Sequence, residues 1–410
     1  MPLTLVVHTS TQPALYGAMA AVAALSLGDH ARLMHLPATF LPADGADAVQ
    51  HVAAEGELVP SGLLWFERLT GRPVPRTGYA QAIVEAAARE QVVVPWHPPV
   101  QAAADFESLL SLAQQQDVTV RLWQVEELEG RWRLRAVDGD ACPDAWWHRD
   151  ALGRLAPEGV CSGDAPHAEQ AVAPLRIAVI GTEFDQRGVY PANLASLADA
   201  AGALGLSLDI RFVDPQTFRP AHLQGVDGVV LPGGSDMGNV AGQLAVAQQT
   251  LQSGVPTMGL CLGMQTMSTA LVRSMPGLAD ANLAEADPDA PVKSFVPLAA
   301  TPGLPVFRVG DQPVTISDPV FRQWLGEETS IRCNHRFGLN PLLVPRLREQ
   351  GVSIAAVDAS GLIVDAIRKP AHPFYAGMQG HPELGSRPDT PHPLMMAFLR
   401  AAAGKAGQAA

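Results

Sequence analysis

The chain is poor in cysteine, in basic residues and in long apolar runs, and each shortage excludes a class of protein. Its four cysteines lie far apart with no Cys-x-x-Cys pair, so we expect neither a disulfide framework nor a bound metal. Lys and Arg number 28 against 41 Asp and Glu, and the net charge of −13 argues against a nucleic-acid or membrane partner. No apolar run is long enough for a membrane span, and no basic leader precedes one, so we expect a cytoplasmic, reduced protein.

The length and apolar content favour two globular domains. The chain has 410 residues, of which 47% are hydrophobic. Residues 156–174 are rich in Pro, Gly and small side chains, which predicts a linker there. We therefore expect a smaller N-terminal α/β domain of unknown role over residues 1–155, a C-terminal domain over residues 175–402, and a frayed tail over residues 403–410.

The pattern of apolar segments indicates an α/β fold in both parts. In the C-terminal domain, strand-like runs alternate with helix-like segments, which favours a mainly parallel sheet with helices on both faces. In the N-terminal domain, residues 14–27 predict a helix, and residues 118–124 with 132–137 predict a β-ribbon. Residues 1–174 contain neither Gly-x-x-x-x-Gly-Lys-[Ser/Thr] nor Gly-x-Gly-x-x-Gly, so no nucleotide phosphate loop is expected there.

The stretch Gly259-Leu260-Cys261-Leu262-Gly263 predicts a nucleophile elbow, because it joins a strand-like run to a helix-like run. Glycines fit beside a sharp turn that crowds the neighbours of the nucleophile. The cysteine would begin a helix, where free N–H groups and the dipole favour a thiolate. A free thiol has a pKa of roughly 8.5, so a nucleophile at neutral pH needs such help. A buried cysteine in a Gly-rich turn is the alternative explanation of this pentapeptide.

Two further motifs favour the catalytic explanation. His381-Pro382-Glu383 follows the cysteine by 120 residues. In an extended segment, residues two apart point to the same side, so His381 would contact Cys261 while Glu383 orients the imidazole. Gly233-Gly234, after an apolar run, would let backbone N–H groups face an oxyanion. A nucleophile, a base with its orienting group and an oxyanion turn in one domain predict cysteine-based catalysis.

With these motifs, residues 175–402 resemble the class I (triad) glutamine amidotransferases, most closely the glutaminase domain of CTP synthase. Residues 259–265 match the family's Gly-Ile-Cys-Leu-Gly-Met-Gln, and residues 372–394, which include His381-Pro382-Glu383, match over their whole length. Residues 332–340 are similar to the family's Arg-His-Arg-His-Arg-Tyr-Glu-Val-Asn.

The resemblance implies a role for each of eight residues. They are a catalytic triad of Cys261, His381 and Glu383, an oxyanion hole made by Gly234 and the backbone of Leu262, and three groups for the amino-acid end of glutamine, Gln265, Glu285 and Arg336. A guanidinium suits the substrate carboxylate, and a carboxylate suits its ammonium. For Glu285, a solvated acidic loop residue remains the alternative.

The chain also departs from that family. The lid motif Gly-Gly-Thr-Met-Arg-Leu-Gly, tied to GTP activation, has no clear counterpart, and residues 294–298 occupy its region. Cys333 and Asn334 replace two basic residues, and Ser235 follows the glycine pair in place of the family's Phe. We therefore do not expect GTP activation.

The resemblance implies hydrolysis of glutamine to glutamate and ammonia through a thioester, without a metal or organic cofactor. The ammonia would pass to an acceptor on the N-terminal domain, on a partner synthetase subunit that binds ATP and Mg, or within a homo-oligomer. One alternative is a stand-alone amide or γ-glutamyl hydrolase with the same triad. Another is a non-catalytic glutamine sensor or scaffold.

Overall fold

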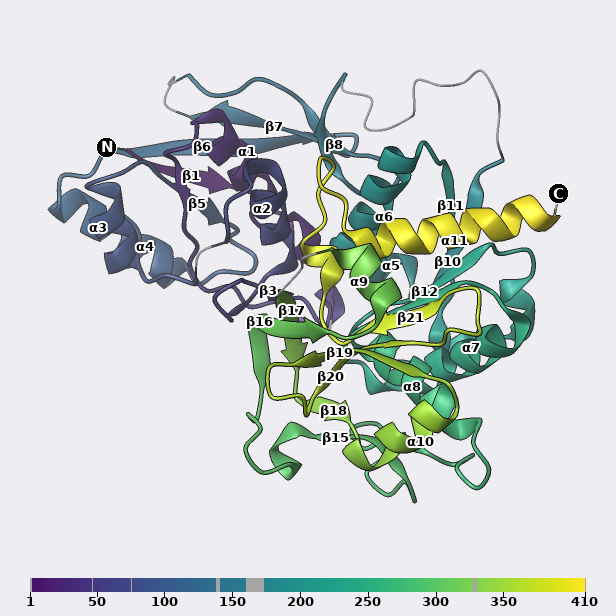
Figure 1. Cartoon of the computed structure of the whole chain (residues 1–410). Helices are drawn as coiled ribbons and strands as arrows, with labels where there is room; N and C mark the ends of the chain where they lie inside the picture. The colour runs from purple at the N-terminus through teal and green to yellow at the C-terminus, as the bar shows by residue number, and fades with distance from the viewer. Residues whose placement is uncertain are drawn as a thin grey trace. The chain divides into compact units, whose positions relative to one another are not determined.

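The computed structural model describes residues 2–45, 47–74, 76–137, 141–159, 173–326 and 330–409. The chain forms two compact units, Met1–Ser162 with Phe184–Ala195, and Gly163–Glu183 with Ser196–Ala410 (Figure 1). Both contain helices and strands, so the expected α/β class is confirmed. The expected linker falls largely on residues 160–172, which lie outside the described residues, and the position of the domain boundary stays a prediction.

The first unit is built on a seven-stranded sheet in the order β2-β5-β1-β6-β7-β8-β9. The strands from β2 to β6 run parallel, and those from β6 to β9 run antiparallel. The expected β-ribbon is confirmed as the antiparallel pair β6 and β7. The strands are β1 (Leu3–Val7), β2 (Arg32–Leu33), β5 (Val92–Trp96), β6 (Val120–Leu128), β7 (Arg131–Ala136), β8 (Trp147–Arg149) and β9 (Leu155–Pro157), with a separate hairpin of β3 (His51–Val52) and β4 (Leu58–Val59).

Helices of the first unit include α1 (Ala18–Ser26), α2 (Leu64–Thr70), α3 (Ala80–Ala87) and α4 (Ala103–Gln115). The single helix expected over residues 14–27 is wrong at its start, because a 3-10 turn, Pro13–Leu15, precedes α1. Gly17 separates the two at φ +71°, a left-handed conformation that other residues rarely adopt. A Cβ at this position would also lie 2.7 Å from the side chain of Leu63.

The second unit contains a nine-stranded sheet in the order β11-β10-β12-β13-β21-β20-β19-β16-β17. The five strands from β11 to β21 are parallel, and the rest of the sheet continues antiparallel. The sheet strands are β10 (Leu175–Val179), β11 (Leu208–Phe212), β12 (Gly228–Leu231), β13 (Thr257–Leu260), β16 (Arg308–Ile316), β17 (Ser330–His335), β19 (Ser353–Asp358), β20 (Val364–Arg368) and β21 (Tyr375–Met378). A three-stranded sheet is formed by β14 (Asn282–Leu283), β15 (Lys293–Pro297) and β18 (Phe337–Leu339).

Helices cover both faces of the parallel part of this sheet. A Cβ at Gly228 of β12 would lie 2.8 Å from Phe398 of α11 (Pro393–Ala409), whereas Leu231 of the same strand faces Gly263 of α8 (Leu262–Arg273). Residues three apart on a strand point to opposite faces, so α8 and α11 lie on opposite sides. The second unit also contains α7 (Val240–Ser253), α9 (Pro319–Leu325) and α10 (Val344–Glu349). The remaining helices, α5 (Glu183–Gly188) and α6 (Pro191–Leu204), include the segment Phe184–Ala195 of the first unit.

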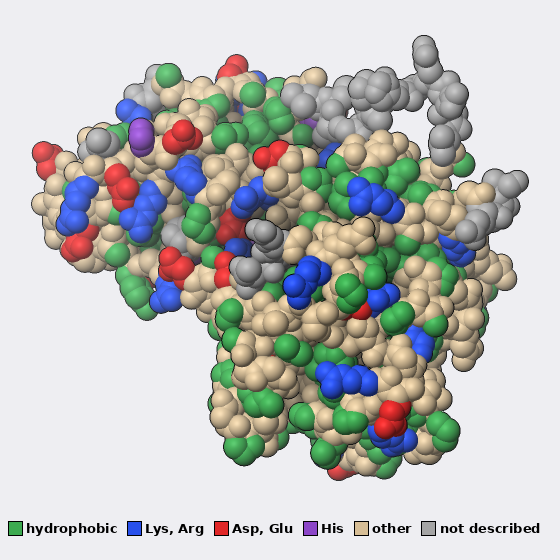
Figure 2. Space-filling view, viewed as in Figure 1, with side chains coloured by type: hydrophobic (Ala, Val, Ile, Leu, Met, Phe, Trp, Pro, Cys, Tyr) green, Lys and Arg blue, Asp and Glu red, His purple; other side chains and the backbone are tan. Residues whose placement is uncertain are grey.

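The expected frayed tail is wrong over most of its length, because α11 continues to Ala409. Ala residues near its end favour the helix despite the two glycines there, and Lys405 donates a hydrogen bond to the Val226 carbonyl at 2.8 Å. Among the described helices, none combines the length and apolar character that a bilayer span requires. On the face drawn in Figure 2, Lys and Arg side chains lie interspersed with acidic and uncharged ones.

Candidate active site

Cys261 occupies a strained turn between β13 and α8. Its backbone lies at φ +49° and ψ −107°, and it is one of three non-glycine residues with positive φ among those described. Such conformations cost free energy and persist only where the surroundings hold them. Here the Cys261 N–H donates to the Met378 carbonyl of β21 at 2.8 Å. The structure thus forms the elbow that the sequence predicts, at the carboxyl ends of two parallel strands.

The positions of Gly259 and Gly263 require glycine, because other backbone segments approach them too closely for a side chain. A Cβ at Gly263 would overlap the Leu231 carbonyl, and one at Gly259 would lie 2.7 Å from the Gly263 carbonyl group. The first turn of α8 therefore lies directly against the ends of β12 and β13. This contact fixes the start of the helix relative to the Gly233-Gly234 turn that follows β12.

His381 and Glu383 form a close pair at the end of β21. The Nδ1 atom of His381 lies 2.7 Å from Oε1 of Glu383, and both side chains are largely buried. Our expectation that the segment is extended is wrong, since Pro382–Leu384 form a 3-10 turn with His381 as its N-cap. Proline is favoured at the first position of such a turn, and the turn directs Glu383 back to the imidazole.

The imidazole of His381 lies close to Cys261. Gly233 lies between them, since a Cβ there would be 3.3 Å from Cβ of Cys261 and 3.1 Å from Cε1 of His381. Burial lowers the pKa of His381, but the charges of Glu383 and Cys261 outweigh this and raise it well above its ordinary value. Nε2 of His381 is buried and binds no nitrogen or oxygen atom of the described residues, which leaves it available to a reacting group.

The two residues expected to form the oxyanion hole are Gly234, which follows β12, and Leu262, at the start of α8. Gly234 adopts φ +150°, a conformation that favours glycine. Leu262 is the first residue of α8, and the first N–H groups of a helix have no acceptor within it. The assignment of these two residues to an oxyanion hole stays a prediction.

Gln265, one of the three residues expected to bind substrate, follows Cys261 on the same helix. It is one turn into α8, buried, and its N–H donates to the Cys261 carbonyl at 3.1 Å. Its side-chain Oε1 is buried and makes no hydrogen bond with the residues that the structure describes. A buried amide oxygen without a partner is costly, and a ligand with an N–H donor would relieve this cost.

Glu285 and Arg336 lie near each other at a more exposed position. Burial raises the pKa of Glu285, and the positive charge of Arg336 opposes this shift. The guanidinium of Arg336 stacks on the ring of Phe307, 4.1 Å from its centroid. Stacking holds the guanidinium plane in one orientation.

Comparison with known proteins assigns this unit. The family model "Glutamine amidotransferase class-I" matches residues 189–401, over half of the chain. The chain belongs to this family.

Relatives of this amidotransferase include CTP synthases. It is 33% identical over 244 residues to that of Cyanothece sp. and 30% identical over 252 residues to that of Methanopyrus kandleri. These alignments cover 56% and 58% of the chain but only 44% and 46% of the relatives, so the chain matches less than half of their length. A solved glutaminase domain of Trypanosoma brucei CTP synthase with bound acivicin aligns at a TM-score of 0.52 and 28% identity, covering 56% of this chain and 94% of that one.

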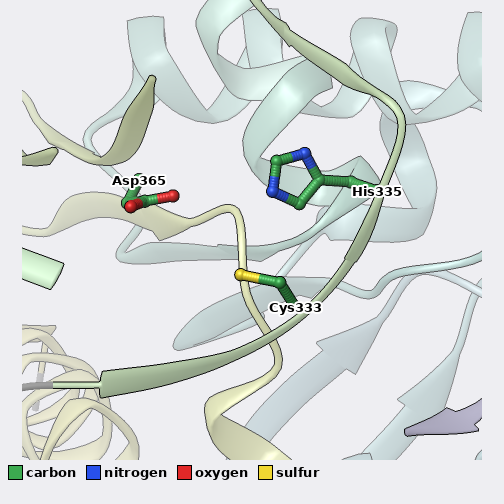
Figure 3. A group of neighbouring side chains, drawn as sticks. All are labelled: Cys333, His335 and Asp365. Atoms are coloured by element: carbon green, nitrogen blue, oxygen red, sulfur yellow. The ribbon is translucent and has the colours of Figure 1, made fainter. Parts of the chain in front are cut away.

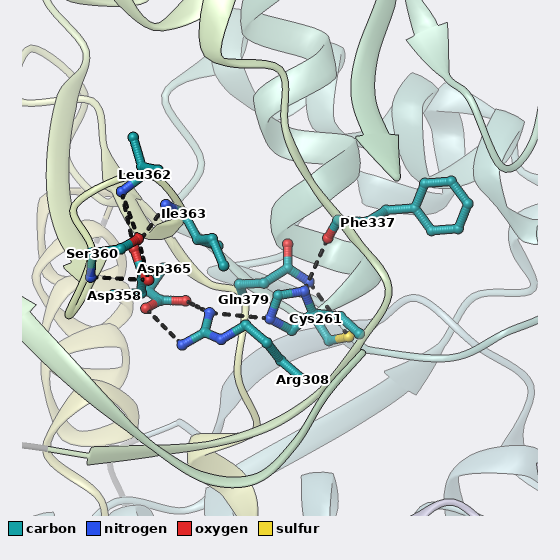
Figure 4. A network of polar contacts seen from close by, with 10 residues as sticks. Cys261, Arg308, Phe337, Asp358, Ser360, Leu362, Ile363, Asp365 and Gln379 are labelled. Carbon is teal, nitrogen blue, oxygen red and sulfur yellow. Dashed lines mark hydrogen bonds and ion pairs between the residues drawn. The ribbon is translucent and has the colours of Figure 1, made fainter. Parts of the chain in front are cut away.

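Sequence reasoning missed a polar network behind Cys261 of this amidotransferase. Arg308 of β16 contacts Asp365 of β20 at 2.5 Å and 3.2 Å (Figure 4). The same guanidinium lies 3.3 Å from Nε2 of His335. Burial and the charge of Arg308 lower the pKa of His335 to about 3, so the ring is neutral. Its Nδ1 then donates to the Phe337 carbonyl at 2.9 Å, and its Nε2 accepts from Arg308.

A signal for Arg308 was present in the sequence. Residues 308–310, Arg-Val-Gly, share the Arg and the Gly with the Arg-Leu-Gly that ends the family's lid motif. We placed residues 294–298 in that region instead. Asp365 lies outside every motif that we recognised, and only the sheet brings it to Arg308.

Within the described residues, Cys333, His335 and Asp365 are the one group that could hold a metal, since one donor atom of each lies within 4.8 Å of the others (Figure 3). However, Arg308 already engages both Asp365 oxygens and the imidazole. Burial also raises the pKa of the Cys333 thiol to about 12, whereas a metal ligand must be a thiolate. The positively charged guanidinium of Arg308 therefore occupies the position that a metal ion would take in this cluster.

Proposed function

We propose that the second unit hydrolyses the side-chain amide of glutamine with Cys261 as nucleophile, His381 as general base and acid, and Glu383 as the group that orients His381. The observation that carries this proposal is the strained Cys261 beside a buried imidazole whose other nitrogen is held by Glu383 at 2.7 Å. A nucleophile, a base and an orienting carboxylate in contact form the arrangement that acyl transfer requires.

In the first step, Sγ of Cys261 attacks the amide carbon of glutamine while the thiol proton passes to Nε2 of His381. The oxyanion is stabilised by backbone N–H groups of Gly234 and Leu262. The C–N bond then breaks, His381 returns the proton to nitrogen, and ammonia leaves a glutamyl thioester. Water, deprotonated by His381, attacks the thioester and releases glutamate and the thiol.

The amino-acid end of glutamine fits the remaining residues. Gln265 supplies a buried Oε1 without a partner among the described residues. Arg336 offers a guanidinium to the substrate carboxylate, and Glu285 offers a carboxylate to the ammonium. These groups distinguish a free amino acid from an amide within a peptide, because a peptide lacks both charges.

We further propose that the ammonia serves an acceptor on the first unit, on a partner synthetase or in a homo-oligomer, in a reducing cytoplasm. No phosphate-loop motif occurs in residues 1–174, so activation of the acceptor by ATP is assigned to a partner. Two findings would contradict transfer of ammonia to an acceptor. The chain would release ammonia to solvent, as a hydrolase does, or it would bind glutamine without turnover, as a sensor does.

The decisive experiment measures glutamate released from glutamine by the full chain in reductant, beside Cys261→Ala and a matched Cys333→Ala control. We expect release by the native chain and by Cys333→Ala, and none by Cys261→Ala. Release that persists in Cys261→Ala would contradict the assignment of the nucleophile.

Absence of release calls for a second measurement, because a coupled amidotransferase can be silent without its acceptor. Labelling by a glutamine-like diazo-ketone, read as a mass change on the Cys261 peptide, tests whether glutamine binds. Labelling that excess glutamine suppresses supports the assignment. An unlabelled Cys261 would contradict glutamine as the substrate.

A further inference from the structure

The sulfur of Cys261 lies between two polar groups of opposite character. The Asn334 carbonyl of β17 lies 3.8 Å from Sγ. Nε2 of Gln379 lies 3.8 Å from the same atom (Figure 4). A carbonyl oxygen only accepts, so it pairs with the thiol. The amide N–H only donates, so it pairs best with the thiolate. The two groups therefore fit two different protonation states of one sulfur.

Gln379 is held in place by the strands around it. Its N–H donates to the Asp365 carbonyl at 2.8 Å, and its side chain is completely buried. The preceding residue, Met378, supplies the carbonyl that binds the Cys261 N–H. The end of β21 thus supports the nucleophile through its backbone and through the next side chain.

The sulfur is the one hydrogen-bond partner of the Gln379 carboxamide within the described residues. Its Oε1 atom is buried and makes no hydrogen bond there. A buried carboxamide loses hydration on both polar atoms and recovers part of that free energy at Sγ. Hydrophobic packing alone would not require an amide at this position.

We propose that Gln379 is a positioning residue that stabilises the Cys261 thiolate and holds its sulfur in the direction of attack. This rests on the proposed function, in which Cys261 is the nucleophile. On deprotonation by His381, the sulfur exchanges its contact with the Asn334 carbonyl for a stronger, charge-assisted one with the Gln379 N–H. The same contact weakens when the thioester forms, because the sulfur loses its charge.

The test is the pH dependence with which iodoacetamide alkylates Cys261, read by mass spectrometry on the Cys261 peptide so that other cysteines do not contribute. Gln379→Met keeps the length of the side chain but removes the donor. We expect the midpoint of its alkylation curve to move about one pH unit upward, the size expected from one hydrogen bond to a charged group. An unchanged midpoint would overturn the proposal, and a downward shift would mean that the carboxamide oxygen faces the sulfur.

Gln379→Asn is the second variant, since its shorter amide keeps the polarity but does not reach the sulfur. It should show the same upward shift, and a native midpoint would again overturn the proposal. Gln312→Met, on β16, is the matched control and should leave the midpoint unchanged, because the Gln312 side chain donates to the Val309 carbonyl. A fall in kcat at constant KM for glutamine is expected for both Gln379 variants.

Alkylation needs no glutamine turnover, so the two proposals fail separately. A shifted midpoint in a chain that releases no glutamate and whose Cys261 is not labelled by the glutamine-like diazo-ketone would support the role of Gln379 and contradict the substrate. Glutamate release with native midpoints in both Gln379 variants would support the function and contradict the role of Gln379.

Discussion

His381 and Glu383 are separated by a single residue and joined by a 2.7 Å contact between Nδ1 and Oε1. The contact depends on a 3-10 turn that begins at Pro382, and it lies in a largely buried environment. Because burial opposes a charged imidazole, the carboxylate and the Cys261 sulfur must together supply the free energy that keeps its pKa high.

Glu383→Gln should reduce activity strongly while leaving the fold intact. The amide cannot stabilise an imidazolium, so we expect a loss in kcat of about a thousandfold, within the range found when an orienting carboxylate is neutralised. Glutamate release at saturating glutamine measures this. Glu349→Gln, at the exposed end of α10, is the control and should retain native kcat. Equal activity of both variants would contradict a role for Glu383.

The same substitution should change how stability depends on pH. The folded-state pKa of His381 is raised above its unfolded value of about 6.5. Its contribution to the free energy of unfolding is therefore complete below about pH 6.5 and is lost as pH rises through the folded pKa. In urea unfolding measured from pH 6 upward, the free energy of unfolding should fall more steeply with pH in the native chain than in Glu383→Gln. If the two plots of unfolding free energy against pH ran parallel, they would contradict a raised pKa of His381.

Gly263→Ala should destabilise the chain, because its Cβ would overlap the Leu231 carbonyl. Backbone atoms cannot move aside cheaply, so we expect a loss of about 3 kcal/mol in the free energy of unfolding. Gly404→Ala is the matched control, since nothing lies within 4 Å of its added Cβ in α11. It should instead stabilise the chain by about 0.5–1 kcal/mol, the helix preference of Ala over Gly.

The elbow and the His-Pro-Glu motif could be predicted because the information is local. A cysteine between two glycines, placed between a strand and a helix, specifies a sharp turn whatever the rest of the sheet does. The direction of Glu383 was also predicted, but for the wrong reason. We assumed an extended segment, whereas proline at the first position of a 3-10 turn sets the geometry.

The network behind Cys261 could not be predicted in the same way. Arg308 and Asp365 are 57 residues apart, and β19 lies between their strands in the sheet. Their pairing depends on the register of several antiparallel strands, which local patterns do not encode. Gln379 was within a recognised segment, but its contact with the sulfur follows from how β21 ends beside the elbow.

Breaking the buried pair of Arg308 and Asp365 should be costly. Arg308→Met leaves a carboxylate without a partner, and we expect a loss of about 3–5 kcal/mol in the free energy of unfolding. In a double-mutant cycle, Arg308→Met with Asp365→Leu should lose much less than the sum of the two single changes. Arg211→Met is the control, because its pair with Asp209 is over 40% exposed at both side chains and should contribute under about 1 kcal/mol. Additive losses at the buried pair would show that the two residues do not interact.

Phe307 and Arg336 should affect the affinity for glutamine more than the chemical step. The ring lies 4.1 Å from the guanidinium and orients it, so Phe307→Leu should raise KM by about two- to fivefold, the value of one exposed stacking contact. Arg336→Met removes the charge itself and should raise KM at least about tenfold. In both variants kcat should stay within about twofold of native, since this interaction is equal in the ground and transition states. Leu342→Ala, at a side chain that is 82% exposed, should change neither constant. Steady-state kinetics over a wide range of glutamine concentration separates kcat from KM. A fall in kcat at native KM would contradict the assignment, because Arg336 would then contact the reacting atoms instead of the amino-acid end of the substrate.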